Sequence, residues 1–260
     1  MWTIATQPTA LWVGNWNTNV YADVYNYVKR AQDDGGMPVL ALYNIPQRDC
    51  GGYSDGGADV AAYPGWVEQV APAIGSEQAA VILEPDALAQ IDQPGCLSDV
   101  AKAKRYALLQ LAVSTLKNRA ANTTVYLDAG HSNWISANNM AQYLKNAGIA
   151  AADGFALNVS NFTSIESNVA YGNQLSALAG GKHFVVDTSR NGSGPASDGQ
   201  WCNPAGRTLG ASPQGFSSGL VDAFLWIKRP GESDGSCRGG PGAGIFWPPF
   251  AYELTLRPNR

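Results

Sequence analysis

The chain has 260 residues, of which 45% are hydrophobic and 15% charged, so it is long enough to bury one large core. Its net charge of −4 gives no support to nucleic-acid binding, because nucleic-acid-binding domains usually carry a basic surface. No apolar run reaches ~18 residues, so we expect neither a membrane span nor a membrane partner. We expect residues 1–260 to form a single domain.

The first residues and the cysteines bear on the compartment. Met1 is followed by residues without the basic and apolar regions of a secretion signal. Either the protein is not secreted, or its signal is absent from this chain. The second option is favoured by four scattered cysteines without a CxxC pair, a pattern that suits two disulfides in an oxidising compartment and not a zinc site: Cys50, Cys96, Cys202 and Cys237. Three pairings are open at this point, and four buried free thiols are the alternative.

Apolar periodicity predicts strands that alternate with helices along the whole chain. Long polar loops are expected at 44–59 and 191–219. The expected elements are a strand at 10–13, a helix at 20–31, a strand at 37–43, a helix at 66–74 that is interrupted or begins again near Pro72, a strand at 80–83, a helix at 97–120, a strand at 123–127, a helix at 137–147, a strand at 154–157, a helix at 165–178, strands at 183–186 and 222–227, and a helix at about 250–256. About seven β/α units predict a parallel sheet with helices outside it.

The segment from Val81 to Asp86 is the most informative stretch of the sequence. A short, β-branched apolar run leads directly into carboxylates, and Pro85 ends the strand. Asp86 then lies just past the strand in an apolar setting, where burial should raise the pKa of its carboxyl. A carboxyl that is protonated near neutral pH is what a general acid requires. The alternative is a helix N-cap, which is the commoner role of an Asp in this position.

Four aspartates follow different predicted strands: Asp49, Asp86, Asp128 and Asp234. The carboxyl ends of parallel strands lie on one side of a sheet, which is where α/β proteins form active sites. Aromatic residues are expected at the same side, namely Trp12, Trp16, Tyr43, Tyr53, Trp134 and Trp201. Flat aromatic rings beside carboxylates suit sugar rings. Singly, each Asp is better explained as a cap, turn residue or ion-pair partner, and each Trp as core packing.

Other chemistries find little support in the sequence. No GxSxG turn accompanies His131 or His183, which counts against a Ser-His-Asp hydrolase. The aspartates do not show the spacing of a metal site, and no strand is followed by a nucleotide-binding glycine motif. We therefore expect no metal and no cofactor. Cleavage of a glycosidic bond, in contrast, needs one protonated carboxyl and a charged partner.

Several motifs together resemble glycoside hydrolase family 6. They are Tyr43–Pro46 with Arg48–Cys50, Glu84–Asp86, Asp128–His131, Asp187–Gly192, Trp201–Pro204 and Trp226–Gly235, and the match runs from about Leu11 to the end of the chain. The resemblance implies a distorted barrel of about seven parallel strands, which agrees with the strand count. It also implies a single catalytic domain that acts on cellulose, as an endo-β-1,4-glucanase or a cellobiohydrolase.

The resemblance also implies roles for individual residues. Asp86 matches the general acid, and Asp49 the carboxylate that raises the pKa of the acid and steadies the oxocarbenium-like transition state. Asp128 matches a supporting carboxylate, and Asp234 the candidate base, which acts directly or through a water chain. Tyr43 matches the residue that crowds the distorted sugar. The sugar-binding positions are matched by Trp12, His131, Trp134, Asn161, Trp201, Lys228 and Glu232. An inverting mechanism follows, with two carboxyls about 6.5–9.5 Å apart.

Two further expectations come with the resemblance. The disulfides become Cys50–Cys96 and Cys202–Cys237, each bracing a loop that carries site residues. The stretches 51–63 and 235–246 are short for the roof of a cellobiohydrolase tunnel, so an open cleft and endo cleavage are favoured. Compared with the family, we expect this chain to lack the usual N-terminal extension, a binding module and a linker. We expect a secreted monomer, and the alternatives are a cellobiohydrolase or a non-catalytic glucan-binding barrel.

Overall fold

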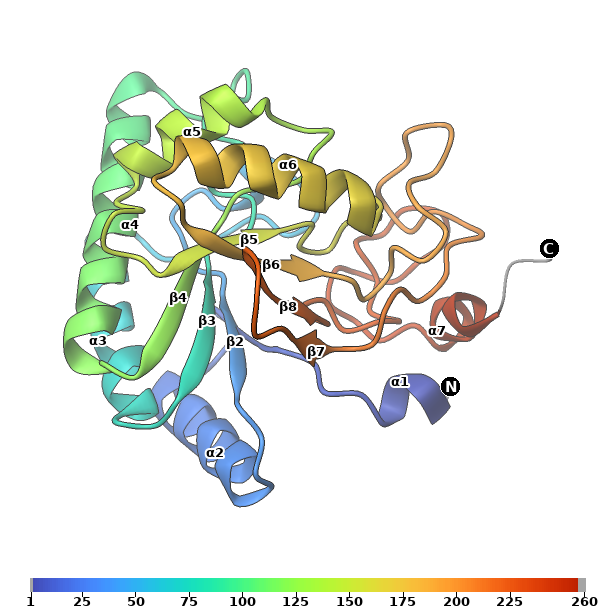
Figure 1. Ribbon diagram of the computed structural model, residues 1–260, viewed down its shortest axis with the longest axis horizontal. Coiled ribbons are helices and arrows are strands. Elements are labelled where there is room, and N and C mark those ends of the chain that lie inside the picture. Colours follow the sequence, from blue (N-terminus) through green and yellow to red (C-terminus); the bar gives the residue numbers. More distant parts are fainter. Residues whose placement is uncertain (1, 257–260) are drawn as a thin grey trace.

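The computed structural model describes residues 2–256 and shows a strongly curled sheet with helices around its outer side (Figure 1). The strands are β1 (Leu11–Val13), β2 (Val39–Leu42), β3 (Ala79–Leu83), β4 (Thr123–Asp128), β5 (Gly154–Leu157), β6 (His183–Asp187), β7 (Gln214–Gly215) and β8 (Val221–Leu225). The helices are α1 (Trp2–Ala5), α2 (Val20–Asp33), α3 (Tyr63–Ile74), α4 (Asp99–Arg119), α5 (Ala137–Asn146), α6 (Ile165–Leu178) and α7 (Pro248–Thr255).

The sheet has eight strands in the order β1-β2-β3-β4-β5-β6-β8-β7, and every neighbouring pair is parallel except β8 with β7. The sheet curls so far that the residue before β1 bonds to the residue after β8: the Ala10 N–H donates to the Trp226 carbonyl over 3.1 Å. The expected distorted barrel of about seven parallel strands is therefore confirmed.

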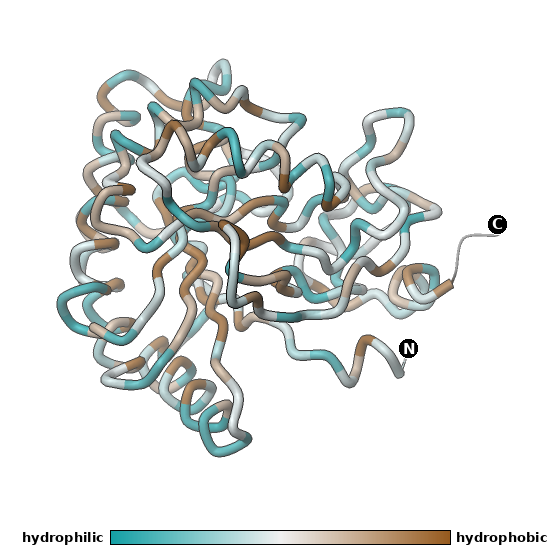
Figure 2. The backbone as a smooth tube through the Cα atoms, in the orientation of Figure 1, coloured by the Kyte–Doolittle hydropathy of each residue, from teal (hydrophilic) through white to brown (hydrophobic). Residues whose placement is uncertain are grey.

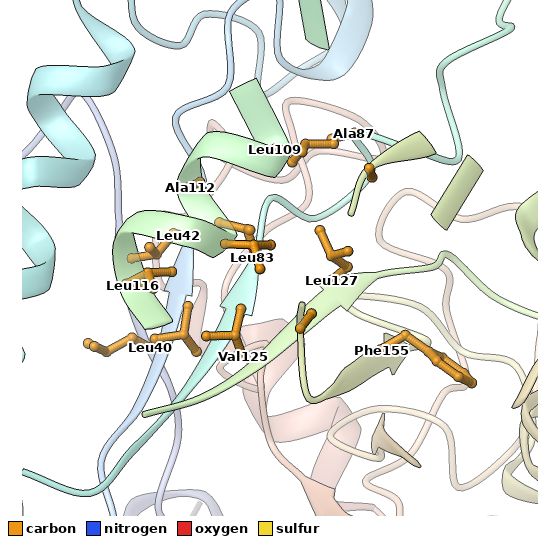
Figure 3. Packing of buried hydrophobic residues seen from close by; sticks show 14 of the residues in the cluster. Leu40, Leu42, Leu83, Ala87, Leu109, Ala112, Leu116, Val125, Leu127 and Phe155 are labelled. Atoms are coloured by element: carbon orange, nitrogen blue, oxygen red, sulfur yellow. The ribbon is translucent and has the colours of Figure 1, made fainter. Parts of the chain in front are cut away.

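Apolar side chains fill both sides of the sheet. On the outer side, Leu109, Ala112 and Leu116 of α4 lie over β2 to β4 (Figure 3). On the inner side, smaller residues such as Ala41, Ala80 and Ala156 pack with Ile82 and Tyr126. All five residues of β3 are buried, which explains why its sequence is continuously apolar instead of alternating. Figure 2 shows this pattern as hydrophobic strands inside a more polar shell.

The structure differs from the predicted elements in a few places. Helix α3 begins at Tyr63 and continues through Pro72, where a break or restart was expected. The short elements α1 and β7 lie in stretches expected to be irregular, and a 3₁₀ turn covers Asp49–Gly51. Helix α1 is a single turn, too short for a helical period, and β7 and the 3₁₀ turn lie in polar loops without an apolar run.

The disulfide pairing is the one that the resemblance implied. Cys50 pairs with Cys96 and Cys202 with Cys237, so both bridges join loops at the carboxyl side of the sheet. The first links the loop after β2 to the segment after β3, and the second links two loops on either side of β8. Within residues 2–256, no helix combines the length and the apolar character needed to cross a membrane.

Candidate active site

The four aspartates meet where the strands end. Asp128 is the last residue of β4, and the other three lie in loops that follow β2, β3 and β8. Asp86 is bonded to two other site residues: its N–H donates to Asp128 Oδ2 over 3.0 Å, and its Oδ2 accepts a hydrogen bond from Tyr43 Oη over 3.1 Å. Lys228, which follows β8, also acts electrostatically on both Asp86 and Asp234. We call this region, formed by the loops after β2, β3, β4 and β8, the mouth.

The backbone turns sharply where β3 delivers Asp86. Glu84 and Asp86 both adopt left-handed φ values, 53° and 68°, which are uncommon for residues other than glycine. The Glu84 carboxylate is buried and holds the turn by accepting the N–H groups of Asn44 and Ile45, each over 2.8 Å, and the Tyr63 hydroxyl over 2.8 Å. Non-glycine strain of this kind persists where surrounding contacts over-determine it, and it is frequent at active sites.

Asp86 does not cap a helix. No helix begins directly after it: the next helix, α4, starts at Asp99 and has Ser98 as its N-cap. The Asp86 side chain instead accepts the Tyr43 hydroxyl at the mouth. The N-cap alternative for Asp86 is therefore wrong, because the chain forms a run of turns between β3 and α4.

The surroundings of Asp86 favour its protonated form. Burial is the largest cause that raises the pKa of its carboxyl to about 7, and the negative charge of Asp49 adds to it. The Tyr43 hydroxyl and the positive charges of Lys228 and Arg105 act in the opposite direction. A substantial fraction of Asp86 thus carries a proton at neutral pH, as a general acid must.

Asp49 lies in a loop that a buried arginine organises. The Arg48 guanidinium donates to the carbonyl oxygens of Tyr43, Ser54 and Asp55 over 2.7, 2.7 and 3.1 Å. It also lies 5.2 Å from the centroid of the Trp16 ring and 4.7 Å from that of Tyr43. These contacts fold the loop back on itself. Sequence reasoning did not identify this role, because an arginine in a polar loop normally indicates an exposed charge.

Asp128 lies beneath the mouth and not on its surface. Its side chain is buried, and Oδ2 accepts the N–H groups of Asp86 and Gly130 over 3.0 and 3.2 Å. Burial, followed by the charge of Asp86, raises the pKa of Asp128 to about 8. This carboxyl holds the backbone of Asp86, a position that fits the supporting role expected for it.

Asp234 forms a buried ion pair. Arg190 Nη1 lies 2.9 Å from its Oδ1 and 3.1 Å from its Oδ2, and the Asn203 N–H donates to Oδ2 over 3.0 Å. Arg190 is fully buried beneath the mouth, where its guanidinium lies 4.4 Å from the centroid of the Phe162 ring. Arg190 is a site residue that the sequence analysis missed, because its partner lies 44 residues away along the chain.

The aromatic residues fall into two groups on the mouth. On one side, the Trp12 ring meets Tyr43 edge to face and Lys228 Nζ lies 5.8 Å from its centroid. Lys228 also lies 3.7 Å from Glu232. On the other side, the ring of His131 lies 5.4 Å from that of Trp134, and burial lowers the pKa of His131 to about 4, so this ring is neutral near pH 7.

Two loops contact each other at the mouth. Tyr53 lies directly against Gly235, where a Cβ would come within 2.2 Å of the Tyr53 ring, and Gly235 has a φ of 158°. The half-exposed Trp201 lies 6.2 Å from the Tyr53 ring. Asn161 lies on the loop after β5, and its amide donates to the Val159 carbonyl. Trp12 lies within the three-residue strand β1, and the other predicted sugar-binding residues occupy the loops that follow β4, β5, β6 and β8.

Asp187, like Arg190, is a buried residue that holds site loops in place and that the sequence did not single out. It ends β6, and its carboxylate accepts the N–H groups of Ser160, Ser189 and Lys228 over 2.9–3.0 Å. These bonds fix the loop after β5 and the start of the segment that carries Lys228. Within residues 2–256, no group of three or more His, Cys, Asp or Glu side chains is arranged to hold a metal ion.

Comparisons with known proteins show what this chain is similar to. The family model described as Glycosyl hydrolases family 6 matches residues 1–257. Endoglucanase A of Cellulomonas fimi is 46% identical over 97% of this chain and 55% of its own length. Endoglucanase 1 of Streptomyces halstedii is 44% identical over 96% of this chain and 79% of its own. A relative named probable 1,4-beta-D-glucan cellobiohydrolase C, from Aspergillus terreus, is 30% identical over 80% of this chain.

A solved structure is similar over nearly the whole fold. The endoglucanase Cel6 of Mycobacterium tuberculosis, in complex with a methyl-cellobiosyl-thio-cellobioside, superposes with a TM-score of 0.93 and 47% identity, covering 97% of this chain and 87% of that one. The present chain spans only about half the length of the Cellulomonas fimi relative. The family match nevertheless covers almost every residue, and the chain belongs to glycosyl hydrolase family 6.

Proposed function

We propose that this protein is an inverting endo-β-1,4-glucanase that hydrolyses cellulose and soluble β-1,4-glucans. The observation that carries the proposal is the Asp86 carboxyl, whose pKa of about 7 makes it a proton donor at the mouth of a family 6 barrel. The relatives named endoglucanases, at 44–46% identity, support this reading over that of a cellobiohydrolase.

Hydrolysis of the glycosidic bond gives each group at the mouth a role. Asp86 gives its proton to the glycosidic oxygen, and the bond from the anomeric carbon to that oxygen breaks. A water molecule attacks the anomeric carbon from the opposite face and loses its proton to solvent. The negative charge of Asp49 stabilises the oxocarbenium-like transition state and keeps Asp86 protonated until transfer. Tyr43, which donates to Asp86, crowds the sugar at the cleavage point.

We infer that Asp234 does not take the water's proton directly. Both of its oxygens face Arg190, and one also accepts a backbone N–H. Protonation of Asp234 would leave the buried Arg190 guanidinium without its counter-ion, which costs several kcal/mol. A water chain that passes the proton outward avoids this cost. Asp234 then contributes a fixed negative charge in the loop after β8.

The aromatic groups fit a glucan chain lying across the mouth. Trp12 with Lys228 and Glu232 forms one sugar-binding group, and His131 with Trp134 forms another. Asn161 and Trp201 add positions on the loops after β5 and β6. Sugar rings stack on aromatic faces, while their hydroxyls bond to charged and amide groups. His131 is suited to neutral hydroxyls because the low pKa of its ring keeps it uncharged.

The endo mode rests on loop length and on the named relatives. The stretches 51–63 and 235–246, which correspond to the loops that would roof a tunnel, are short. A non-catalytic glucan-binding barrel would need the aromatics but not a carboxyl with a raised pKa, so the environment of Asp86 favours an enzyme. We further propose that the protein works as a secreted monomer outside the cell, where its two disulfides are stable.

Viscometry of a soluble cellulose derivative tests the endo mode. Random internal cleavage should reduce the viscosity steeply while few reducing ends have formed. A tunnel enzyme of the same family should release many reducing ends before the viscosity falls. Activity with a slow fall in viscosity would replace the endoglucanase reading by that of a cellobiohydrolase, and absence of hydrolysis together with glucan binding would favour the non-catalytic barrel.

A further inference from the structure

Gln90 lies one turn beyond the proposed acid. Its backbone N–H donates to the carbonyl of Asp86 over 2.9 Å, so the two residues share one compact turn after β3. The Gln90 side chain is buried, with 6% of its surface exposed. A glutamine amide is rarely buried without a hydrogen-bonding partner, because removing it from water then costs free energy.

Within residues 2–256, the amide nitrogen of Gln90 has Asp49 as its partner, whereas the buried Oε1 of the same amide has none. Gln90 Nε2 donates to Asp49 Oδ1 over 3.2 Å, and the backbone N–H of Ser54 donates to the other carboxylate oxygen over 2.7 Å. In the part of the chain from 2 to 256, Gln90 is the only side chain that donates a hydrogen bond to Asp49. Ser54 belongs to the same loop as Asp49, whereas Gln90 belongs to the segment of Asp86. The Gln90 bond therefore connects the two carboxylates across separate parts of the chain.

We propose that Gln90 is a positioning residue, which fixes the carboxylate of Asp49 relative to Asp86 so that the charge of Asp49 acts on the acid. The proposal rests on the proposed function, in which Asp86 must hold its proton. Gln90 shares a turn with Asp86 and also holds the carboxylate of Asp49. The separation of Asp49 from Asp86 therefore does not depend on the loop of Asp49 alone. The Cys50–Cys96 disulfide and Arg105, which donates to the carbonyls of Pro46, Gln47 and Ala87, also join the two segments, but the Gln90 bond is the one that reaches the Asp49 carboxylate itself.

The direction of the effect follows from the charges around Asp86. Asp49 is the negative neighbour that favours the protonated acid, so a displaced Asp49 should lower the pKa of Asp86. An acid that loses its proton at lower pH moves the alkaline limb of kcat to lower pH. The other ionisable or charged groups near the pair come from four elements and remain unchanged in the test: Tyr43, Arg48, Arg105, Asp128 and Lys228.

The test compares Gln90→Leu with Asp49→Asn. Leucine has a similar size but no donor, so we expect the alkaline limb of kcat on soluble cellulose to move down by about half a pH unit, and by about one unit when Asn removes the whole charge of Asp49. A ¹³C NMR titration of the Asp86 carboxyl carbon reports the same shifts without turnover. In the Asp49→Asn background, Gln90→Leu should add no further shift, because the charge that it positions is absent.

Two controls separate positioning from general damage. Gln110→Leu removes another glutamine amide bond, from the exposed side of α4 to the Asn146 carbonyl, and should leave the limb unchanged. Gln90→Asn keeps an amide that is one methylene too short to reach Asp49, so it should shift the limb as leucine does, even if leucine destabilises the fold. An unmoved Asp86 titration in a folded Gln90 variant would overturn the proposal. Absence of hydrolysis by the wild type would instead refute the proposed function and leave the NMR test intact.

Discussion

Asp86→Asn is expected to lower kcat on soluble cellulose about 1,000-fold while the protein remains folded. Asparagine has nearly the same shape and can still accept a hydrogen bond from the Tyr43 hydroxyl, but it has no acidic proton to give to the leaving oxygen. Steady-state kinetics measure the loss. Thermal unfolding of the same sample should show little destabilisation, since a neutral amide replaces a carboxyl that burial already disfavours in its charged form.

The leaving group supplies the control for this prediction. An acidic phenol can leave without being protonated. The Asp86→Asn variant should therefore lose far less activity on a substrate with such a leaving group than on a glucan. Asp153→Asn, at a surface ion pair with Lys117, is the matched Asp change away from the mouth and should leave both activities intact. Equal losses on both substrates would mean that Asp86 is not the proton donor.

Arg190→Met is expected to reduce the free energy of unfolding by about 3–5 kcal/mol, because it leaves the Asp234 carboxylate buried without its partner. Arg190 is fully buried and Asp234 is 8% exposed, so water cannot replace the lost charge. Urea denaturation measures the change. The bond from Arg190 to the Ser160 carbonyl is lost as well, which loosens the loop that also carries Asn161.

A double variant and a surface pair complete this test. Arg190→Met with Asp234→Leu should be more stable than Arg190→Met alone, since the second change removes the stranded charge. Arg119→Met breaks the exposed pair with Glu68 and should cause much less destabilisation. If the double variant were as unstable as the sum of the two single ones, the pair would not be coupled and Asp234 would be free to accept a proton.

The periodicity of apolar residues predicted most of the strands and helices, because burial of one segment shows directly in its own sequence. Strand β3 reads as a continuous apolar run because both of its faces are buried, and β5 and α6 begin and end at the residues that periodicity indicated. The position of Asp86 after β3 followed from the same reasoning. The family motifs then supplied what pattern could not, including the pairing of the four cysteines.

Contacts between distant segments could not be predicted from the sequence. Arg190 reads as an ordinary arginine until the fold places it beside Asp234, and Gln90 reads as a turn residue until its amide meets Asp49. Asp86 itself looked more like a helix cap than an acid when taken alone. Each of these roles depends on side chains from separate loops meeting at the mouth, and no local spacing encodes such a meeting.

The stereochemistry of the first products from cellohexaose tests the account most directly. Water that attacks from the face opposite to the leaving group inverts the anomeric carbon, so a β-linked glucan should first release products in the α form. Proton NMR at early times, before the anomers equilibrate, distinguishes the two forms. We predict α-anomers that appear with internal cleavage of the hexamer. Initial release of β-anomers would contradict the mechanism, because it would require a covalent intermediate on a mouth carboxylate.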